Sequence, residues 1–198
     1  IGSTGSIGQN AVSVLTAINF RDKFKVTGLS AHSNTALLKK QARQFKPAGI
    51  CVGKESDACN FEKEFPKSAV YSGIPGLKKL ASLPGADIIL IAVVGAVGIY
   101  PLISALRAGK RVALANKESK VIAGDLIREI IDCGKGEIIP VDSEHSAIYQ
   151  CLAGENPAYI NLFIITGSGG PFYKKPDLKN VTVLQALKNP NWKMGKKI

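Results

Sequence analysis

The sequence predicts an α/β protein in which a parallel sheet of Rossmann type is followed by the start of a second α/β domain. Three observations lead to this fold class. A glycine-rich turn at residues 2–8 precedes an amphipathic run, short apolar runs then alternate with helical patterns as far as residue 139, and an acidic stretch, DSEH, follows at 142–145. We expect residues 1–141 to form the nucleotide-binding domain and 142–198 to be an incomplete catalytic domain.

Composition narrows the classes of partner. The chain has 198 residues, is 45% hydrophobic and carries a formal net charge of +11. Its lysines are scattered over helix faces and loops rather than interleaved with aromatic residues, so we expect small polyanionic ligands and no nucleic acid. No apolar run reaches eighteen residues, so we expect no membrane partner. The four cysteines have no CxxC spacing, which favours reduced thiols over a zinc site.

The two ends of the chain suggest a fragment. Only Ile1 stands before Gly2, where a Rossmann first strand would need several residues, and no closing signal precedes Ile198. We therefore expect the first strand to be truncated. A missing signal or transit peptide therefore gives no information about the compartment.

The opening segment GSTGSIG places glycines at positions 2, 5 and 8 before the apolar pattern of 11–18. Glycines permit a tight turn and let a pyrophosphate approach the N–H groups at the start of a helix. The spacing is GxxGxxG rather than the commoner GxGxxG. We interpret the segment as a dinucleotide loop, with a plain turn as the alternative.

A second strand is expected over 25–29, followed by Ser30-Ala31-His32-Ser33-Asn34. Enzymes that use NAD place an acid at this position, but this chain has none between Asp22 and Glu55. Donors that suit a 2′-phosphate stand there instead, with cations in the next helix: His32, Ser33, Asn34, Lys39, Lys40 and Arg43. This pattern favours NADP over NAD. Alternatively, Ser33 or Asn34 only caps the helix.

The middle of the chain continues the alternation. We expect strands at 49–52, 87–94 and 111–115, helices at 57–64 and 99–108, and a turn at 73–76. The strand at 87–94 ends in VVGAVG, and the strand at 111–115 runs into Asn116-Lys117-Glu118-Ser119. Ligands of open parallel sheets bind beyond the carboxyl ends of the strands. Lys117 is therefore a candidate for a substrate anion and Asn116 for the cofactor, and a solvated turn is the alternative.

A helix at 126–133 and a strand at 137–139 lead to the acidic stretch. If this stretch is extended, Asp142 and Glu144 project from one face. Such a pair needs a cation, a shared proton or an outward turn into water. Further on we expect a strand at 160–166, a glycine nest at 167–170, a capping box at 182–185, and a lid or Trp-anchored loop at 189–195.

Together these segments resemble the 1-deoxy-D-xylulose 5-phosphate reductoisomerase family over the whole chain. The motifs that carry the resemblance occur in the family's order: GSTGSIG, ALANKES, PVDSEHSAIYQCL, TGSGGPF and NPNWKMGKKI. The resemblance implies an NADPH-dependent, metal-assisted rearrangement and reduction of 1-deoxy-D-xylulose 5-phosphate to 2-C-methyl-D-erythritol 4-phosphate. It also implies a homodimer in the full-length protein.

The resemblance assigns roles to individual positions. The residues that it assigns to cofactor binding are Thr4, Gly5, Ser6, Ile7, Ser33, Asn34, Ala92, Val93, Asn116 and Glu118. It assigns Mg²⁺ or Mn²⁺ to Asp142 and Glu144, which with Lys117 would be the catalytic residues. It places the substrate against Lys117, Ser143, Glu144, Ser168, Asn189 and Trp192, with Met194 in a mobile flap beside Trp192.

Two departures qualify the resemblance. Asn189 stands where the family has His, and an amide cannot exchange a proton near neutral pH. The family's third metal ligand would lie beyond Ile198, so we expect the chain alone to be inactive.

The alternatives are a dinucleotide-binding fragment without turnover and another GxxGxxG reductase of the aspartate-semialdehyde dehydrogenase type.

Overall fold

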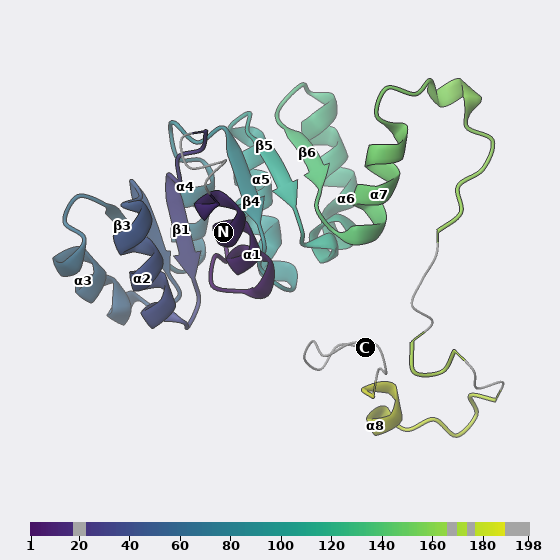
Figure 1. Ribbon diagram of the computed structural model, residues 1–198, viewed down its shortest axis with the longest axis horizontal. Helices are drawn as coiled ribbons and strands as arrows, with labels where there is room; N and C mark the ends of the chain where they lie inside the picture. Colours follow the sequence, from purple (N-terminus) through teal and green to yellow (C-terminus); the bar gives the residue numbers. More distant parts are fainter. Residues whose placement is uncertain (18–22, 166–169, 174–176, 189–198) are drawn as a thin grey trace. The chain divides into compact units, whose positions relative to one another are not determined.

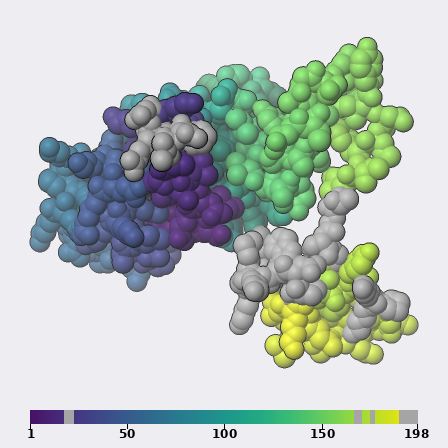
Figure 2. All heavy atoms as spheres, in the orientation of Figure 1, coloured from purple at the N-terminus to yellow at the C-terminus, as the bar shows by residue number. Residues whose placement is uncertain are grey.

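The computed structural model describes residues 1–17, 23–165, 170–173 and 177–188. It divides into two compact units, Ile1–Cys151 and Leu152–Ile198, shown as a ribbon in Figure 1. In the first unit, helices pack against parallel strands, and Figure 2 shows all heavy atoms in the same orientation. The α/β fold class is therefore confirmed.

The first half of this unit is a parallel sheet in the order β1-β2-β3. Its register pairs Gly28 with Gly49 and Gly49 with Ala69. Its strands are β1 (Gly28–Ala31), β2 (Gly49–Val52) and β3 (Ala69–Ser72), and the neighbouring helices are α1 (Ser6–Thr16), α2 (Thr35–Phe45), α3 (Glu55–Glu64) and α4 (Gly73–Ala81).

The second half is a parallel sheet in the order β4-β5-β6. Its register pairs Ile88 with Arg111 and Arg111 with Glu137. Its elements are β4 (Ile88–Ile91), η1 (Ala96–Gly98), α5 (Ile99–Arg107), β5 (Arg111–Leu114), α6 (Lys117–Asp132), β6 (Glu137–Pro140) and α7 (Ser143–Leu152).

Residues 1–3 join the two sheets. The Ile1 nitrogen donates to the Leu90 carbonyl at 2.7 Å, and the Ala92 N–H donates to the Ile1 carbonyl at 2.9 Å. On the other side, the Ser3 N–H donates to the Ser30 carbonyl at 2.9 Å. The strand order therefore reverses beside residues 1–3, which lie between β1 and β4 in Figure 1. Rossmann-type folds bind ligands at this kind of reversal.

Each sheet has its own apolar core. Leu38, Ile50 and Phe61 are buried around the first sheet. Ile91 and Leu102 are buried around the second. Burying a side chain of this size contributes about 1.5–3 kcal/mol, so these two clusters stabilise the strand ends that carry the site.

The expected turn at residues 73–76 is wrong, because Gly73 begins helix α4. Pro75 is tolerated there because the first helical N–H groups have no intrahelical partner. Gly76 suits a close contact, since a Cβ at this position would lie 2.8 Å from the Tyr71 Cβ. The turn-forming residues therefore mark a tightly packed helix start.

Two further expectations fail at helix starts. Helix α6 begins at Lys117 rather than near residue 126, with a break at Ala123 (φ −123°, ψ 27°). Helix α7 begins at Ser143, so the stretch after Asp142 is helical rather than extended. Some strand limits also differ, because β1 starts three residues later than expected and β4 ends before the VVGAVG loop.

The second unit contains less regular structure in its described part. Its elements are η2 (Pro157–Tyr159) and α8 (Val183–Ala186). The capping box between Thr182 and Gln185 is confirmed. The expected strand at 160–166 is wrong over its described residues: 160–165 form no strand, and the Ile164 side chain is 80% exposed. Apolar content alone does not make a strand without a partner to pair with. Among the described residues, no helix is long and apolar enough to cross a membrane.

Candidate active site

The glycine loop packs tightly against both sheets. Gly2 has φ +81°, and a Cβ there would lie 2.8 Å from the Ala92 carbonyl oxygen. A Cβ on Gly8 would lie 2.2 Å from the Gly2 carbonyl oxygen. Glycine is therefore needed at both positions, because α1 crosses directly over residues 1–3.

The start of α1 is open to a ligand. Gly5 is the N-cap and has no side chain to satisfy the N–H groups that follow it. Gly5, Ser6 and Ile7 are exposed, and the Gln9 side chain donates to the Thr4 carbonyl at 2.9 Å. Free N–H groups and the helix dipole at this position favour a bound phosphate.

The segment after β1 exposes His32, Ser33 and Asn34. The Asn34 side-chain oxygen accepts from the Leu37 N–H at 3.1 Å, so the capping interpretation is confirmed for Asn34. The cap uses the amide oxygen and not the amide NH₂. A contact between Asn34 and a 2′-phosphate stays a prediction.

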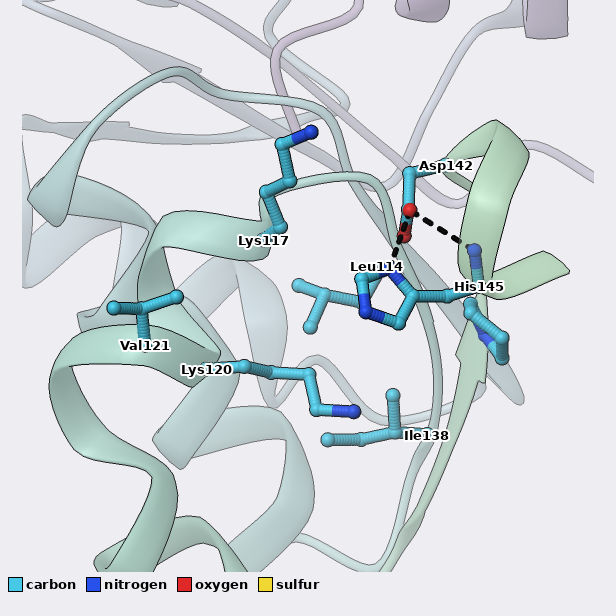
Figure 3. Close-up of a pocket in the computed structure, with 8 residues that line it drawn as sticks. Leu114, Lys117, Lys120, Val121, Ile138, Asp142 and His145 are labelled. Atoms are coloured by element: carbon cyan, nitrogen blue, oxygen red, sulfur yellow. Dashed lines mark hydrogen bonds and ion pairs between the residues drawn. The ribbon is translucent and has the colours of Figure 1, made fainter. Parts of the chain in front are cut away.

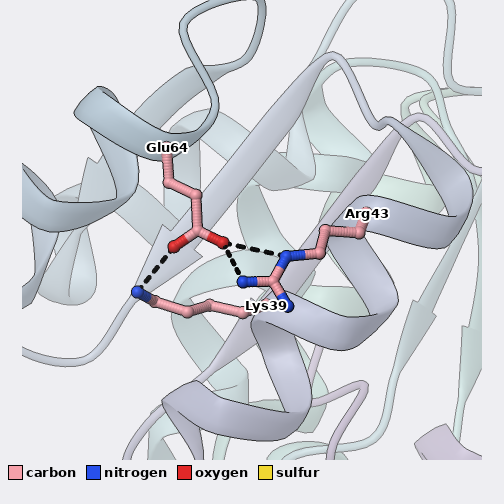
Figure 4. Close-up of polar contacts among 3 residues, drawn as sticks. All are labelled: Lys39, Arg43 and Glu64. Carbon is pink, nitrogen blue, oxygen red and sulfur yellow. Dashed lines mark hydrogen bonds and ion pairs between the residues drawn. The ribbon is translucent and has the colours of Figure 1, made fainter.

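Two of the nearby cations are engaged with α3. Lys39 Nζ lies 2.7 Å from Glu64 Oε2, and Arg43 Nη2 lies 2.5 Å from Glu64 Oε1, as Figure 4 shows. The hydrogen bond from Lys39, helped by Arg43, holds the pKa of the Glu64 carboxyl below its ordinary value. Glu64 therefore partly neutralises the positive charge of Lys39 and Arg43. Lys40 is exposed on the same helix.

A buried amide joins the VVGAVG loop to the start of α6. Asn116 Nδ2 donates to the Val93 carbonyl at 2.8 Å and to the Gly95 carbonyl at 2.9 Å. Its Oδ1 accepts from the Ser119 N–H at 2.8 Å and from the Ser119 hydroxyl. Asn116 is only 1% exposed. Its side chain thus positions the segments that carry Ala92 and Lys117.

The acidic stretch lies at the start of α7, at the carboxyl end of β6. Asp142 Oδ2 accepts from the His145 N–H at 3.2 Å and lies 2.5 Å from His145 Nδ1. Partial burial opposes ionisation of Asp142, but the His145 hydrogen bonds and the charges of His145 and Lys117 outweigh it. The pKa of the Asp142 carboxyl is therefore below its ordinary value.

Glu144 is partly exposed in the first turn of the same helix. Its own backbone N–H and the Ser143 hydroxyl, at 3.1 Å from Oε2, lower the pKa of its carboxyl, and the charge of Lys117 adds to this. Both acids are consequently ionised near neutral pH. They suit a hard divalent cation, although no cluster of three possible metal-ligating side chains occurs among the described residues.

Lys117 and Asp142 line one cavity of about 200 Å³, shown in Figure 3. Its other lining residues are Leu114, Lys120, Val121, Ile138, Pro140 and His145. The cavity therefore combines two lysines, an ionised acid and an apolar wall at the ends of β5 and β6.

The structure brings most of the expected site residues to one edge of the sheets, where the carboxyl ends of β1, β4, β5 and β6 lie. Ser168, Asn189, Trp192 and Met194 lie outside the described residues. Sequence reasoning gave no role to Gln41, Ser119 or His145, all three of which hold site segments. The sequence does place Gln41 between Leu38 and Ala42 on the apolar face of its helix, where a polar side chain is buried and needs a hydrogen-bond partner.

A parallel strand order that reverses beside a glycine loop places this chain among the α/β proteins of Rossmann type. Known proteins agree. Residues 1–124 match the family model of 1-deoxy-D-xylulose 5-phosphate reductoisomerase, and residues 138–198 match the model of its C-terminal domain. The chain belongs to the 1-deoxy-D-xylulose 5-phosphate reductoisomerase family.

Individual relatives cover the whole chain. The reductoisomerase of Thermodesulfovibrio yellowstonii is 46% identical over 200 residues, and that of Pelotomaculum thermopropionicum is 44% identical over 203 residues. In each case 100% of this chain matches 52% of the relative. The chain therefore spans about half the length of these curated relatives.

Solved structures agree with the fold. A reductoisomerase in complex with NADPH, fosmidomycin and magnesium superposes with a TM-score of 0.83 at 33% identity, covering 98% of this chain and 51% of that one. The enzyme from Zymomonas mobilis in complex with NADPH superposes with a TM-score of 0.85 at 33% identity, covering 96% of this chain and 50% of that one.

Proposed function

We propose that this chain is the cofactor-binding part, with the first catalytic motifs, of an NADPH-dependent reductoisomerase. The reaction is the rearrangement and reduction of 1-deoxy-D-xylulose 5-phosphate to 2-C-methyl-D-erythritol 4-phosphate. The observation that carries the proposal is the placement of the glycine loop, Lys117 and the ionised Asp142 beyond the carboxyl ends of strands in a single compact unit. Membership of the family disfavours the semialdehyde dehydrogenase alternative.

The residues present fit NADPH. The uncapped start of α1 offers the N–H groups of Ser6 and Ile7 to the pyrophosphate, beside Thr4 and Gly5, whose own N–H donates to the Gly2 carbonyl at 3.2 Å. Ser33 and Asn34 are exposed beyond β1 for the 2′-phosphate. The remaining cofactor contacts are assigned to the loop after β4 and to the start of α6: Ala92, Val93, Asn116 and Glu118.

The donor set also fits Mg²⁺ or Mn²⁺. Asp142 and Glu144 are carboxylates with lowered pKa values, and Mg²⁺ is commonly held by one or two carboxylates together with substrate oxygens and water. When bound, the ion polarises substrate oxygens and NADPH supplies a hydride. Lys117 holds the anionic substrate next to Asp142, and Ser143 and Glu144 contact it from the first turn of α7.

Several assignments rest on the family resemblance alone. Ser168, Asn189 and Trp192 are proposed as substrate contacts, with Asn189 in the place of a family histidine. We keep the division into residues 1–141 and 142–198 as the domain proposal, although the compact units divide after Cys151. A homodimer and a location in bacterial cytoplasm or plastid stroma complete the proposal.

Glu144→Gln tests the metal assignment in a protein of the relatives' full length that carries this chain. An amide lacks the negative charge that a hard cation needs in its ligand. Loss of a residue that only hydrogen-bonds a metal ligand costs up to about 100-fold in activity, so loss of a ligand itself should lower metal-dependent oxidation of NADPH by more than about 100-fold. The dissociation constant for NADPH should stay within about twofold.

Glu155→Gln, an exposed glutamate beyond α7, is the matched control and should keep both properties. Unchanged turnover in Glu144→Gln would remove Glu144 from the metal site. Absence of turnover in the unmodified protein with substrate, NADPH and Mn²⁺ would reject the proposed function.

A further inference from the structure

Gln41 is a buried amide on α2 that reaches the glycine loop. Its Nε2 donates to the Ser3 carbonyl at 3.0 Å, and its Oε1 accepts from the Ser3 hydroxyl at 2.7 Å. Gln41 is 3% exposed and Ser3 is 7% exposed. Both bonds join residues that are 38 positions apart in the sequence, so they are products of the tertiary fold.

The same segment is held from the β1 side. The Ser3 N–H donates to the Ser30 carbonyl at 2.9 Å, and the Gly2 N–H donates to the Ser30 hydroxyl at 2.9 Å. Ser30 is 2% exposed. Gln41 therefore completes a buried polar cluster, Ser3–Ser30–Gln41, which fixes the backbone directly before Thr4.

The position of this cluster connects it to the cofactor. The N–H groups after Gly5 can bind a phosphate only if the turn that leads to them keeps its direction, and Ser3 is the residue at which that turn is anchored. An apolar side chain of equal length would fill the same space. The amide of Gln41 is needed because the buried Ser3 carbonyl accepts from its Nε2, whereas the Ser3 hydroxyl also donates to the Ser30 carbonyl at 3.2 Å.

We propose that Gln41 is a positioning residue for NADPH. It holds residues 2–3 so that the backbone of residues 4–7 faces the pyrophosphate of the cofactor. This role rests on the proposed function, since it takes NADPH as the ligand. It differs from the role of the residues after β1, which face the 2′-phosphate.

The test measures binding to the 198-residue chain by titration calorimetry, with two ligands. NADPH contains the pyrophosphate, whereas 2′-AMP keeps the adenosine and the 2′-phosphate without it. Gln41→Met removes both hydrogen bonds at similar volume. It should raise the dissociation constant for NADPH about tenfold and leave that for 2′-AMP within about twofold.

Gln44→Met is the matched control, because Gln44 is exposed on the same helix, and it should change neither constant. If Gln41→Met does not fold, Ser3→Ala is the second variant: it removes the hydroxyl that donates to Gln41 Oε1 and to the Ser30 carbonyl, and it should weaken NADPH binding severalfold and spare 2′-AMP. Equal weakening of both ligands, or unchanged NADPH binding, overturns the positioning role. No NADPH binding by the unmodified chain overturns both this role and the proposed function.

Discussion

The cofactor side and the acid side of the site are built differently. On the cofactor side, the buried Ser3–Ser30–Gln41 cluster joins residues 27 to 38 positions apart. On the acid side, exposed hydrogen bonds join Asp142 to His145 and Ser143 to Glu144, at most 3 positions apart. The tertiary fold therefore fixes the cofactor side, whereas one helical turn holds the acid side. We infer that the first is preorganised and that the second adjusts when metal and substrate bind.

The largest expected effect comes from Asn116→Asp. The substitution turns a carboxylate oxygen toward the carbonyls of Val93 and Gly95 in a position that is 1% exposed. Loss of the donor and burial of a charge should lower the free energy of unfolding by about 3 kcal/mol or more, measured by chemical denaturation.

Ser143→Ala is the counterpart on the acid side, and it removes one exposed hydrogen bond. Its effect on the free energy of unfolding should stay within about 0.5 kcal/mol. Equal losses in the two variants would contradict the contrast between the two sides.

A smaller effect, on affinity rather than stability, is expected for Asn34→Asp. Aspartate caps helices as well as asparagine, so the bond to the Leu37 N–H and the melting temperature should be kept. The added negative charge should repel the 2′-phosphate and raise the dissociation constant for NADPH about tenfold.

Because NADH has no 2′-phosphate, its binding should change little in the same variant. Calorimetry with both cofactors makes the comparison. Identical changes for NADPH and NADH would show that Asn34 only caps α2.

The smallest effect concerns Glu64, whose ion pairs join residues far apart in the sequence, as on the cofactor side, but are only partly buried. Because the pKa of Glu64 is lower in the folded chain, its stabilisation is present above the ordinary glutamate pKa and is lost as the pH falls through the lowered value. Glu64→Gln should thus lower the free energy of unfolding slightly at pH about 7, and this loss should shrink as the pH falls below the ordinary glutamate pKa.

Glu62→Gln, an exposed glutamate on the same helix, is the control and should have no effect at neutral or acidic pH. If Glu64→Gln lowered the free energy of unfolding as much as Asn116→Asp, sequence separation rather than burial would decide how much a contact contributes to stability.

Sequence reasoning was most successful where backbone chemistry is local. The glycine loop before α1 and the capping box at Thr182 both occur as predicted. It was wrong where tertiary packing decides, as for the helix that starts at Gly73 and for the apolar residues 160–165.

Site residues divide in the same way. Asp142 and Lys117 could be singled out by their charge and by the strands before them, and the structure places both on one cavity. Gln41 could not, because its role depends on Ser3, 38 positions away, which only the fold brings near it. Ser119 bonds the nearby Asn116, but neither residue's burial could be read from the sequence.

The most direct test of a preorganised cofactor side is calorimetric titration of NADPH into the 198-residue chain without divalent metal. We expect NADPH to bind saturably at one site per chain. Its dissociation constant should stay the same, within about twofold, after Mg²⁺ is added. Binding of NADPH that appears only when Mg²⁺ is present would contradict preorganisation, because the cofactor side would then depend on the acid side for its structure.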